Sequence, residues 1–360
     1  MTVFLVDLEA VPTRYTGEWK DHVPDLLKHA GLDVYVIDGP TDIPAATTPG
    51  AFLNFGGTNV YKAAQVEKIS RLFCNSAVKD GDYFLFSDAW HPGIINLRYM
   101  AELLNVRIRI GALWHAGSYD PQDFLGRLIG DAPWVRHAEK SFFYAVDNNF
   151  FATQFHIEMF MKNLFDRVII PGDPEFVTKK IVKTGWPMEY LVPGLAKWQD
   201  YPKKERILFP HRIAPEKQVE IFNDLAAAMP QYEWIVCQKH PLTKYEYHAL
   251  LGESKMVFSA NLQETLGIGC FEALCVGAIP LVPNRLSYKE MYSSMFSYNS
   301  EWTKDWTSYM KYKGELVNQI VGMMSLFPTP GMQNSIRGER RFIGREFFNA
   351  SEMIKTIQNV

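Results

Sequence analysis

Cysteine is scarce in this 360-residue sequence, whose four cysteines show no metal-ligand spacing: Cys74, Cys237, Cys270 and Cys275. Isolated thiols in apolar surroundings are typical of reduced, buried cysteines, so we expect neither disulfides nor a cysteine metal site, and we expect a cytoplasmic protein. No hydrophobic run approaches the length of a membrane span. The opening segment MTVFLVDLEAVP lacks a basic start and a long apolar stretch, so it indicates a strand rather than a signal peptide.

Excess charge of either sign is also absent. Lysine and arginine number 37 against 40 aspartates and glutamates, which gives a net charge of −3. The total therefore demands no polyanionic partner, although a local basic groove would not show in it. Hydrophobic residues make up 47% and aromatic residues 14% of the chain, enough for the large cores of two domains. We find no repeats and no low-complexity segment.

Two chemical signatures are missing as well. The first expected strand, residues 2–8, is not followed by G-x-G-x-x-G, which argues against a dinucleotide at the first turn and against a nucleotide-sugar epimerase. No metal and no cofactor is expected. No pair of carboxylates at glycosidase geometry can be inferred either.

The stretch from Ser259 to Pro283 is the most informative part of the sequence. It contains Glu264 and Glu272, with Gly267 and Gly269 between them, followed by a helix at 270–276 and an apolar strand at 279–283. A helix N-terminus offers free N–H groups to a phosphate, and carboxylates bind hydroxyls, a combination that suits a sugar nucleotide. The alternative is a capped amphipathic helix with solvated acids.

The pattern E-x7-E followed by A-L-x-x-G-x-I-P-L-V resembles the signature of the large retaining glycosyltransferase family with the GT-B fold. The resemblance implies that Glu264 contacts the donor sugar and Glu272 the nucleotide ribose. It also implies donor contacts from the segment that joins them: Thr265, Leu266, Gly267, Ile268 and Gly269. The match covers about 25 residues directly.

A second segment, P-H-R-I-A-P-E-K-Q, resembles the family's G-R-…-K-G pattern at the first strand of the second domain. Arg212 and Lys217 match its cations, whereas His211 and Gln218 replace both glycines. The resemblance assigns the two cations to the donor diphosphate, whose growing charge they would stabilise. The alternative is a pair of surface cations near a helix start.

The first domain adds candidates at its strand ends. The run D-A-W-H-P-G, which holds Asp88, Trp90 and His91, resembles the D-W-H segment of starch and glycogen synthases; the alternative is a capping Asp with a packed Trp. By resemblance His115, after Trp114, contacts the donor sugar, although a lone His is more often structural. In that family the loop after the first strand faces the donor and the acceptor. Arg14, Tyr15 and Gly17 lie on the corresponding loop here, so the resemblance implies that they contact these substrates.

Hydrophobic patterns predict the remaining elements. Further strands are expected at 32–37, 51–55, 82–87, 107–113, 148–152, 168–170, 206–209, 233–237 and 255–259. Further helices are expected at 61–74, 245–251 and 316–326, with a last helix within 337–360 and a linker at 192–204.

The resemblance implies a GT-B α/β fold of two Rossmann-like domains facing a central cleft. Residues 1–195 form the acceptor-side domain, 196–335 the nucleotide-sugar-binding domain, and 336–360 a helix that returns to the first domain. It also implies retaining transfer of a sugar, glucose or a pentose such as arabinose, from a UDP-sugar to a hydroxyl group.

The acceptor is less well defined by the sequence. The whole chain resembles phage enzymes that glycosylate 5-hydroxymethylcytosine, which makes double-stranded DNA the expected partner and the host cytoplasm the expected location. Aromatic and basic residues interleave at 179–186 and 302–313, and six cations are candidate phosphate contacts: Lys179, Lys180, Lys183, Arg337, Arg340 and Arg341. A polysaccharide, a lipid-linked or a small-molecule acceptor, or an inactive nucleotide-sugar-binding module, remains an alternative. The oligomeric state is left open.

Overall fold

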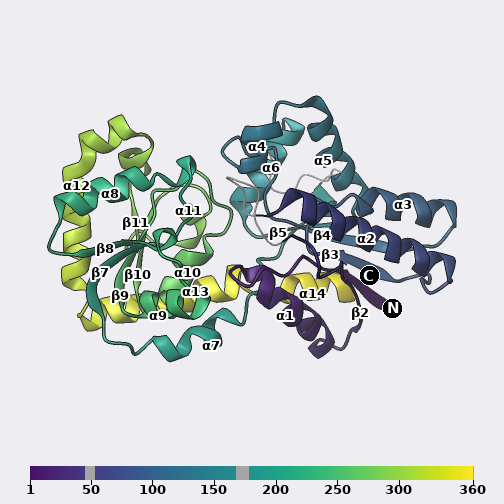
Figure 1. The fold of residues 1–360 in the computed structure, drawn as a ribbon, viewed down its shortest axis with the longest axis horizontal. Coiled ribbons are helices and arrows are strands. Elements are labelled where there is room, and N and C mark those ends of the chain that lie inside the picture. Colours follow the sequence, from purple (N-terminus) through teal and green to yellow (C-terminus); the bar gives the residue numbers. More distant parts are fainter. Residues whose placement is uncertain (45–52, 168–177, 360) are drawn as a thin grey trace. The chain divides into compact units, whose positions relative to one another are not determined.

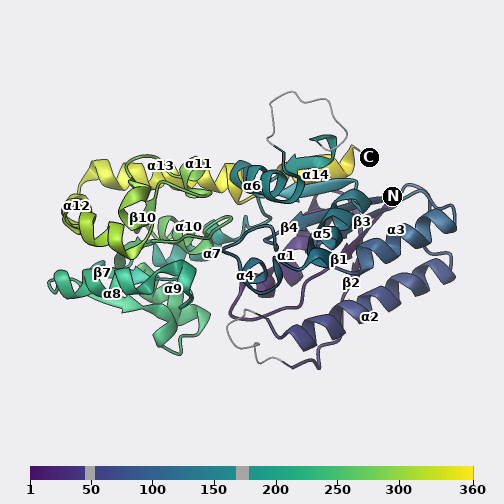
Figure 2. The same ribbon diagram turned by 90° about the horizontal axis from the view of Figure 1, so that it is seen from above.

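The computed structural model describes residues 1–44, 53–167 and 178–359, which form two compact units (Figures 1 and 2). Unit 1 comprises residues 1–187 and 350–360, and unit 2 comprises residues 188–349. The chain thus passes into unit 2 eight residues before the expected boundary at 195. No helix in these described ranges combines the length and hydropathy that a membrane crossing requires.

Unit 1 is built on a six-stranded sheet in which every pair is parallel and the strand order is β2-β1-β3-β4-β5-β6. Short, almost continuously apolar strands are typical of sheets covered on both faces. The strands are β1 (Thr2–Val6), β2 (Asp33–Ile37), β3 (Tyr83–Phe86), β4 (Arg109–Trp114), β5 (Asn148–Phe151) and β6 (Ile181–Lys183).

Helices cover both faces of this sheet. α3 packs against α2 and α5 in one layer, whereas α1 and the C-terminal α14 share the other face (Figure 1). There Gln358 Nε2 donates to the carbonyl of Ala30 at 2.9 Å. The helices of unit 1 are α1 (Tyr15–His29), α2 (Phe55–Cys74), α3 (Gly93–Leu103), α4 (Phe124–Ile129), α5 (Pro133–Ala145), α6 (Gln154–Phe165), α14 (Ser351–Gln358) and the 3-10 helix η1 (Thr178–Lys180).

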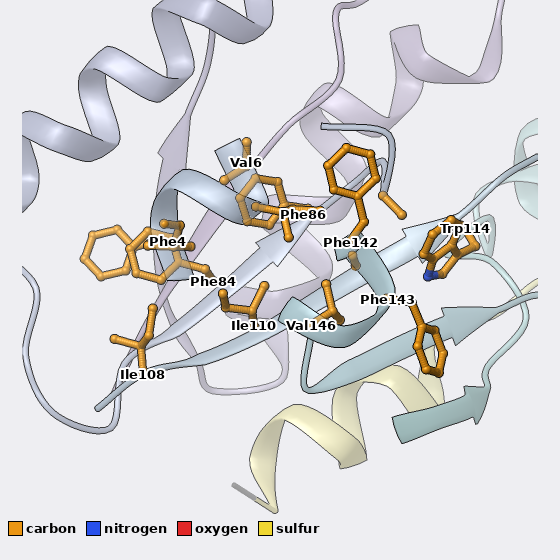
Figure 3. Packing of buried hydrophobic residues seen from close by; sticks show 14 of the residues in the cluster. Phe4, Val6, Phe84, Phe86, Ile108, Ile110, Trp114, Phe142, Phe143 and Val146 are labelled. Atoms are coloured by element: carbon orange, nitrogen blue, oxygen red, sulfur yellow. The ribbon is translucent and has the colours of Figure 1, made fainter. Parts of the chain in front are cut away.

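The main core of unit 1 shows the period of two that a strand imposes. Alternate residues of three neighbouring strands point into one cluster, which Figure 3 shows together with Phe142, Phe143 and Val146 of α5 and its C-terminal end. The members from these three strands are Phe4, Val6, Phe84, Phe86, Ile110, Ala112 and Trp114, and β2 and β5 add Ile37 and Phe151. This apolar layer fixes the register of the strands, so the residues that follow each strand are held at one edge of the sheet.

Unit 2 has a five-stranded parallel sheet of order β11-β10-β9-β7-β8. Its strands are β7 (Lys204–Phe209), β8 (Glu233–Val236), β9 (Ser254–Phe258), β10 (Ile279–Pro283) and β11 (Ser297–Tyr298). Its helices are α7 (Leu191–Leu195), α8 (Val219–Ala228), α9 (Lys244–Gly252), α10 (Ile268–Cys275), α11 (Tyr288–Met291), α12 (Trp306–Leu326), α13 (Pro330–Phe347) and the 3-10 helices η2 (Ala196–Trp198), η3 (Pro215–Lys217), η4 (Cys237–Lys239) and η5 (Ser300–Thr303).

Both sheets reverse their winding direction next to their first strand. In unit 1 the chain moves from β1 to β2 and then to the opposite side of β1 at β3, and in unit 2 it makes the same reversal from β7 to β8 and then β9. The loops at such a reversal run in opposite directions, and the space between them at the carboxyl ends of the strands is where open α/β sheets bind ligands. The fold therefore points to the loops after β1 and β3 and to those after β7 and β9.

Several expected elements need correction. The segment expected as a strand at 51–55 is partly outside the described residues, and its described end is a bend followed by α2, whose N-cap Asn54 accepts from Gly57 N. The strand expected at 168–170 lies outside the described residues. The linker expected at 192–204 instead contains α7, η2 and the start of β7, with Leu195 and Trp198 buried in unit 2. The C-terminal segment is divided, since α13 belongs to unit 2 and α14 to unit 1.

Candidate active site

Lys217 and Glu264 meet in unit 2 at the reversal between β7 and β9. Lys217 ends the turn η3 and is 6% exposed, and its Nζ lies 2.5 Å from the carbonyl of Gln263 and 3.5 Å from Glu264 Oε2. Burial opposes ionisation of Glu264, but the Lys217 ammonium and the backbone N–H groups of Gly267 and Leu266 are among the contacts that together outweigh it, so the pKa of Glu264 is lowered. The predicted cation and the predicted first glutamate are thus neighbours, as a charged pair.

Two unpartnered polar atoms lie beside this pair. Asn261 Nδ2 donates to Glu264 Oε2 at 3.2 Å and lies 3.5 Å from His211 Nδ1. Because burial lowers the pKa of His211 to about 3, the ring is neutral, and a ring that accepts at Nδ1 carries its proton on Nε2. His211 Nε2 and Asn261 Oδ1 are both buried and have no hydrogen-bond partner among the described residues. A buried donor and a buried acceptor are thus available to a polar ligand.

Arg212 lies on the same loop and is paired within it. Its Nη2 is 2.5 Å from Oε1 of Glu216, a carboxylate that is 1% exposed. The Arg212 side chain itself is about a quarter exposed. The two predicted cations therefore differ, since Lys217 is buried against Glu264 and Arg212 is held at the end of the loop by a buried acid.

Backbone N–H groups of the segment that leads into α10 donate to Glu264 within the same segment. Oε1 of Glu264 accepts from the N–H of Thr265 at 3.1 Å and of Leu266 at 3.5 Å. Gly267 has a φ of 75°, and a Cβ there would come within 2.6 Å of the Tyr288 ring. Its glycine character is therefore required by the backbone and by Tyr288 without any ligand. Ile268 and Gly269 begin α10, where a Cβ on Gly269 would touch Pro210.

Glu272 lies in a different set of contacts. Its Oε2 accepts from the Tyr247 hydroxyl at 3.0 Å, and its Oε1 lies 3.4 Å from His248 Nε2. Both partners belong to α9, and Glu272 is 7% exposed. The carboxylate predicted to bind the ribose is thus oriented by α9.

Gln218 stands where the G-R-…-K-G pattern of the family has its second glycine. It takes the left-handed conformation, with φ 53° and ψ 49°, that glycine adopts more easily. Its Nε2 donates to the carbonyls of Ala260 and Thr303 at 2.6 and 2.7 Å. Arg285 Nη2 donates to the same two carbonyls, and Arg285 Nε donates to the carbonyl of Asn261. We call Gln218 and Arg285 the loop clamp, because they fix the backbone before Glu264.

His115 is the centre of the strand-end group in unit 1. Its Nε2 lies 2.6 Å from the Ser87 carbonyl and its Nδ1 2.8 Å from the Tyr15 hydroxyl. A carbonyl only accepts, so Nε2 carries the proton and Nδ1 accepts from Tyr15; burial lowers the pKa of His115 and keeps it neutral. The ring packs against Trp19 and Trp186. Both ring nitrogens are therefore already in use inside unit 1.

Asp88, on the loop after β3, is ionised by its neighbours. Burial would raise its pKa, but Lys62, whose Nζ is 2.8 Å from Asp88 Oδ2, and other contacts lower the pKa to about 2. Trp90 Nε1 donates at 2.9 Å to Glu139, which also accepts from the Ser118 backbone at 2.6 Å. Glu139 thus ties the loop after β3 to the loop after β4.

Two of the acceptor-side candidates lie in the interior of unit 1. Trp114 is fully buried, and its Nε1 donates to Asn149 Oδ1 at 2.8 Å. His91 is 2% exposed, accepts from Gly93 N and donates to Gln65 Oε1, and burial lowers its pKa to about 3. Neither ring reaches the surface of unit 1, because the strand-end segments turn inward onto the apolar core.

The loop after β1 places the remaining candidates together. Arg14 caps α1, with its guanidinium 5.6 Å from the centre of the Tyr15 ring. The Tyr15 hydroxyl is hydrogen-bonded to His115. A Cβ on Gly17 would come within 2.9 Å of the Val11 carbonyl, so the close backbone approach at Gly17 is made by the loop itself.

Sequence reasoning missed several residues of these groups. Asn261, Lys62 and Glu139 carry no local motif. Asn261 reaches Glu264 within the loop after β9, whereas Lys62 of α2 and Glu139 of α5 contact Asp88 and Trp90 only through the packing of segments distant in sequence. His211 was noted only as a lost glycine. Its position directly after the strand residues 206–209 was the one available signal, since side chains after a strand gather at the ligand-binding edge.

Comparisons with known proteins bear on the fold. No protein-family model matches the sequence, and no curated protein matches it at significant similarity. Sucrose-phosphate synthase from Thermosynechococcus elongatus is similar in structure, with a TM-score of 0.62 at 12% identity over 99% of this chain and 98% of that one.

Two further solved structures match over almost their whole length. The catalytic domain of starch synthase IV from Arabidopsis thaliana, bound to ADP and acarbose, has a TM-score of 0.58 at 10% identity over 99% of this chain and 98% of its own. The UDP-forming α,α-trehalose-phosphate synthase from Burkholderia vietnamiensis has a TM-score of 0.56 at 12% identity, with both chains fully covered. At these identities the likeness concerns the fold. The chain has the two parallel-sheet, Rossmann-like α/β units of the GT-B glycosyltransferase fold.

Proposed function

We propose that this protein transfers a sugar from a nucleotide diphosphate sugar, UDP-linked, to a hydroxyl group of an acceptor. The observation that carries the proposal is the cluster of Lys217, Glu264, His211 and Asn261 at the winding reversal of unit 2. It combines a buried cation, an ionised carboxylate, and an unpartnered N–H and amide oxygen. A sugar diphosphate offers partners to all four, since phosphate oxygens accept and sugar hydroxyls both donate and accept.

The donor half of the reaction is assigned to unit 2. Lys217 and Arg212 would bind the diphosphate together with the N-terminal end of α10, and Glu264 would accept from a sugar hydroxyl. Glu272, oriented by Tyr247 and His248, would bind the ribose hydroxyls. A lysine brings a compact charge and an arginine a planar fork, which together suit a diphosphate that gains charge as it leaves.

The chemistry we propose is displacement with retention. The acceptor oxygen forms its bond to the anomeric carbon on the face from which the diphosphate departs, while the bond from that carbon to the phosphate oxygen breaks. The acceptor proton passes to the departing phosphate oxygen. Lys217 and Arg212 lower the barrier by stabilising the negative charge that develops on the diphosphate, the kind of preorganised electrostatic contribution that is large in enzymes.

For the acceptor we propose a 5-hydroxymethylated cytosine in double-stranded DNA. The supporting observations are exposed cations on both units, Lys179, Lys183 and Arg341, and the exposed Trp306. Lys180 is a weaker candidate than the sequence indicated, because its ammonium donates to the carbonyls of Tyr144 and Val146. A base inside a duplex would have to leave the stack to react.

The test is a transfer assay with separate arms. The protein is incubated with UDP-glucose or a UDP-pentose and with hydroxymethylcytosine DNA, unmodified DNA or a mixture of free saccharides. Nucleosides and saccharides are then analysed by mass spectrometry, and the anomeric configuration of the product by NMR. We expect one sugar to be added to hydroxymethylcytosine, with the α-configuration of the donor kept.

The outcomes separate the alternatives. Transfer to a saccharide without transfer to DNA would replace the acceptor proposal and leave the donor proposal standing. An inverted anomeric centre would contradict retention. Binding of UDP with no transfer to any acceptor and no release of UDP from the donor would favour an inactive nucleotide-sugar-binding module.

A further inference from the structure

Unit 2 contains a pocket of about 300 Å³ that shares no residue with the proposed donor site. It lies beside the C-terminal end of α10, where Leu274 and Gly277 line it, and α13 contributes its opposite wall with Ile336, Arg337 and Arg340. Lys203, from the segment just before β7, completes its charged lining together with Asp200. The pocket is as large as the smaller ligand sites of proteins.

The cations of this pocket have only neutral partners. Lys203 Nζ donates to the Val276 carbonyl at 2.7 Å, Arg340 Nη1 donates to Gln199 Oε1 at 2.7 Å, and Arg337 Nη2 donates to Asn334 Oδ1 at 2.5 Å. Over the ranges that the structure describes, none of the three forms an ion pair. Two guanidinium groups and the amine of Lys203 therefore line one pocket, in which Asp200 is the one acidic side chain among the described residues.

The donors of these side chains are not exhausted by those bonds. An ammonium has three N–H groups and a guanidinium has five, and each of the three side chains has one hydrogen bond within the protein. The apolar parts of the lining, Leu274, Phe327 and Ile336, leave room for a small carbon skeleton. Uncompensated cations with spare donors beside an apolar wall fit an anionic small molecule.

We propose that this pocket binds a small phosphate ester, with the phosphate held by Lys203, Arg337 and Arg340. The size of the pocket suits a ligand such as a sugar phosphate. Two of these three cations, Arg337 and Arg340, were expected from the sequence to contact DNA, and the geometry assigns them to a small anion instead.

The ionisation of Lys203 agrees with such a ligand. Burial lowers the pKa of Lys203 to about 7, so part of the population is neutral near pH 7 while the pocket is empty. The charged groups that line the pocket with it are Asp200, Arg337 and Arg340. A bound dianion favours the ammonium form, so binding should take up a proton near neutral pH and should weaken as the pH rises above about 7.

The experiment measures binding by calorimetry and by the rise of the unfolding temperature, because a ligand of the native state stabilises it. The probes are inorganic phosphate, glucose 6-phosphate, uncharged glucose and a short DNA duplex, all with UDP present to occupy the proposed donor site. Sulfate serves as the probe for the pH series, because its charge does not change there, whereas a phosphate monoester loses its second proton near pH 6. The variants are R337A/R340A, K203M and, as matched control on the same helix, R341A.

We expect glucose 6-phosphate to bind the parent and R341A equally, and to bind R337A/R340A about ten- to a hundredfold more weakly, as for lost hydrogen bonds to a charged group. K203M should lose affinity and also the pH dependence of sulfate binding. Circular dichroism shows whether each variant is folded, and R337Q/R340Q replaces the alanine pair if that pair is not.

Three results would overturn the proposal. One is equal affinity of the phosphate ester for the parent and for folded R337A/R340A or R337Q/R340Q. The second is a response to phosphate that is abolished by R212A and kept in R337A/R340A, which would place the anion at the donor site. The third is binding of the duplex that needs Arg337 and Arg340 while neither phosphate nor glucose 6-phosphate binds, which would return these cations to nucleic-acid contacts.

Discussion

Lys217 is a buried cation on which both the charge of Glu264 and the proposed stabilisation of the diphosphate depend. We expect Lys217→Met to lower kcat for sugar transfer by about ten- to a thousandfold, the range for a lost electrostatic contact in the transition state. Without the ammonium, the pKa of Glu264 should rise, so the acidic limb of the pH–rate profile should move to higher pH.

A matched control for this change is Lys204→Met, which removes an ion pair with Glu253 at the surface of unit 2. It should leave kcat and the profile unchanged, because exposed pairs contribute little. Equal kcat, KM and pH dependence for the parent and Lys217→Met would show that Lys217 has no part in the reaction.

Asp7, directly after β1, has a buried carboxyl group whose ionised form destabilises unit 1. Tyr61 and Gln65 donate to Oδ1 at 2.7 and 3.0 Å, whereas Oδ2 is buried without a partner among the described residues. Burial raises the pKa of Asp7 from 3.8 to about 7. The native state therefore holds a proton that the unfolded chain releases, so this contribution to stability is present below pH 3.8 and is lost as the pH rises through about 7.

We predict that Asp7→Asn is more stable than the parent at pH 8, by about 1–3 kcal/mol, because the amide keeps the acceptor at Oδ1 and carries no charge. The difference should shrink as the pH falls to 5. Urea unfolding at both pH values measures it. A variant that is less stable than the parent at pH 8 would contradict the assignment of a buried, strained carboxyl group.

For single residues, the exposure of a side chain was harder to predict from the sequence than its charge. The motif resemblance singled out Lys217 and Glu264 separately, and the structure shows them as an ion pair. Trp114 and His91 stood at equally suggestive strand ends, yet both are buried. Whether a side chain after a strand points to the edge or into the core depends on the packing of helices that are distant in sequence, as with Gln65 of α2 on His91.

Among the elements, the start of α8 depends on the loop clamp. Gln218 takes the left-handed backbone conformation, which costs a non-glycine residue free energy. It offsets this cost with two hydrogen bonds, to the carbonyls of Ala260 and Thr303, to which Arg285 also donates. Gln218→Gly removes the hydrogen bonds and the backbone cost together. Gln218→Ala removes the hydrogen bonds and keeps the backbone cost.

We therefore predict the order of stability parent, Gln218→Gly, Gln218→Ala, with about 1 kcal/mol between the two variants and about 1–3 kcal/mol lost in Gln218→Ala. Thermal unfolding gives the order. If Gln218→Ala were as stable as the parent, the clamp would have no energetic role; if it were more stable than Gln218→Gly, the left-handed backbone would carry no cost.

The elements themselves were well predicted where a pattern was long or bounded by glycine and proline. The strands expected at 279–283 and 148–152 are confirmed, as Ile279–Pro283 and Asn148–Phe151. The strand expected at 51–55 was wrong over its described part, because its apolar residues belong to the entry of α2. Apolar runs of this length do not separate a strand from a helix start.

On the scale of the whole molecule, unit 1 is completed by the last residues of the chain. α14 adds two buried side chains, Met353 and Ile357, to a unit whose other elements end at residue 187. We expect Ile357→Ala to lower the free energy of unfolding by about 2–4 kcal/mol, the usual cost of truncating a buried aliphatic side chain.

Lys355→Ala, on the exposed face of the same helix, should change the free energy of unfolding by less than about 0.5 kcal/mol. Comparison of the two by urea unfolding, with tryptophan fluorescence as the signal, is the measurement. Similar small effects of both substitutions would mean that α14 adds no stability to unit 1. The sequence indicated a returning C-terminal helix through the family resemblance, but not that α13 stays with unit 2.

The central claim is that unit 2 binds the donor nucleotide at the reversal between β7 and β9. Calorimetric titration of the whole protein with UDP tests it most directly, using Arg212→Ala, Glu272→Gln and, as control, Arg345→Ala on the exposed face of α13. We predict one UDP per chain, with affinity unchanged in Arg345→Ala and about ten- to a hundredfold weaker in the other two, as for charge-assisted hydrogen bonds. Equal affinity of UDP for the parent, Arg212→Ala and Glu272→Gln would contradict the claim.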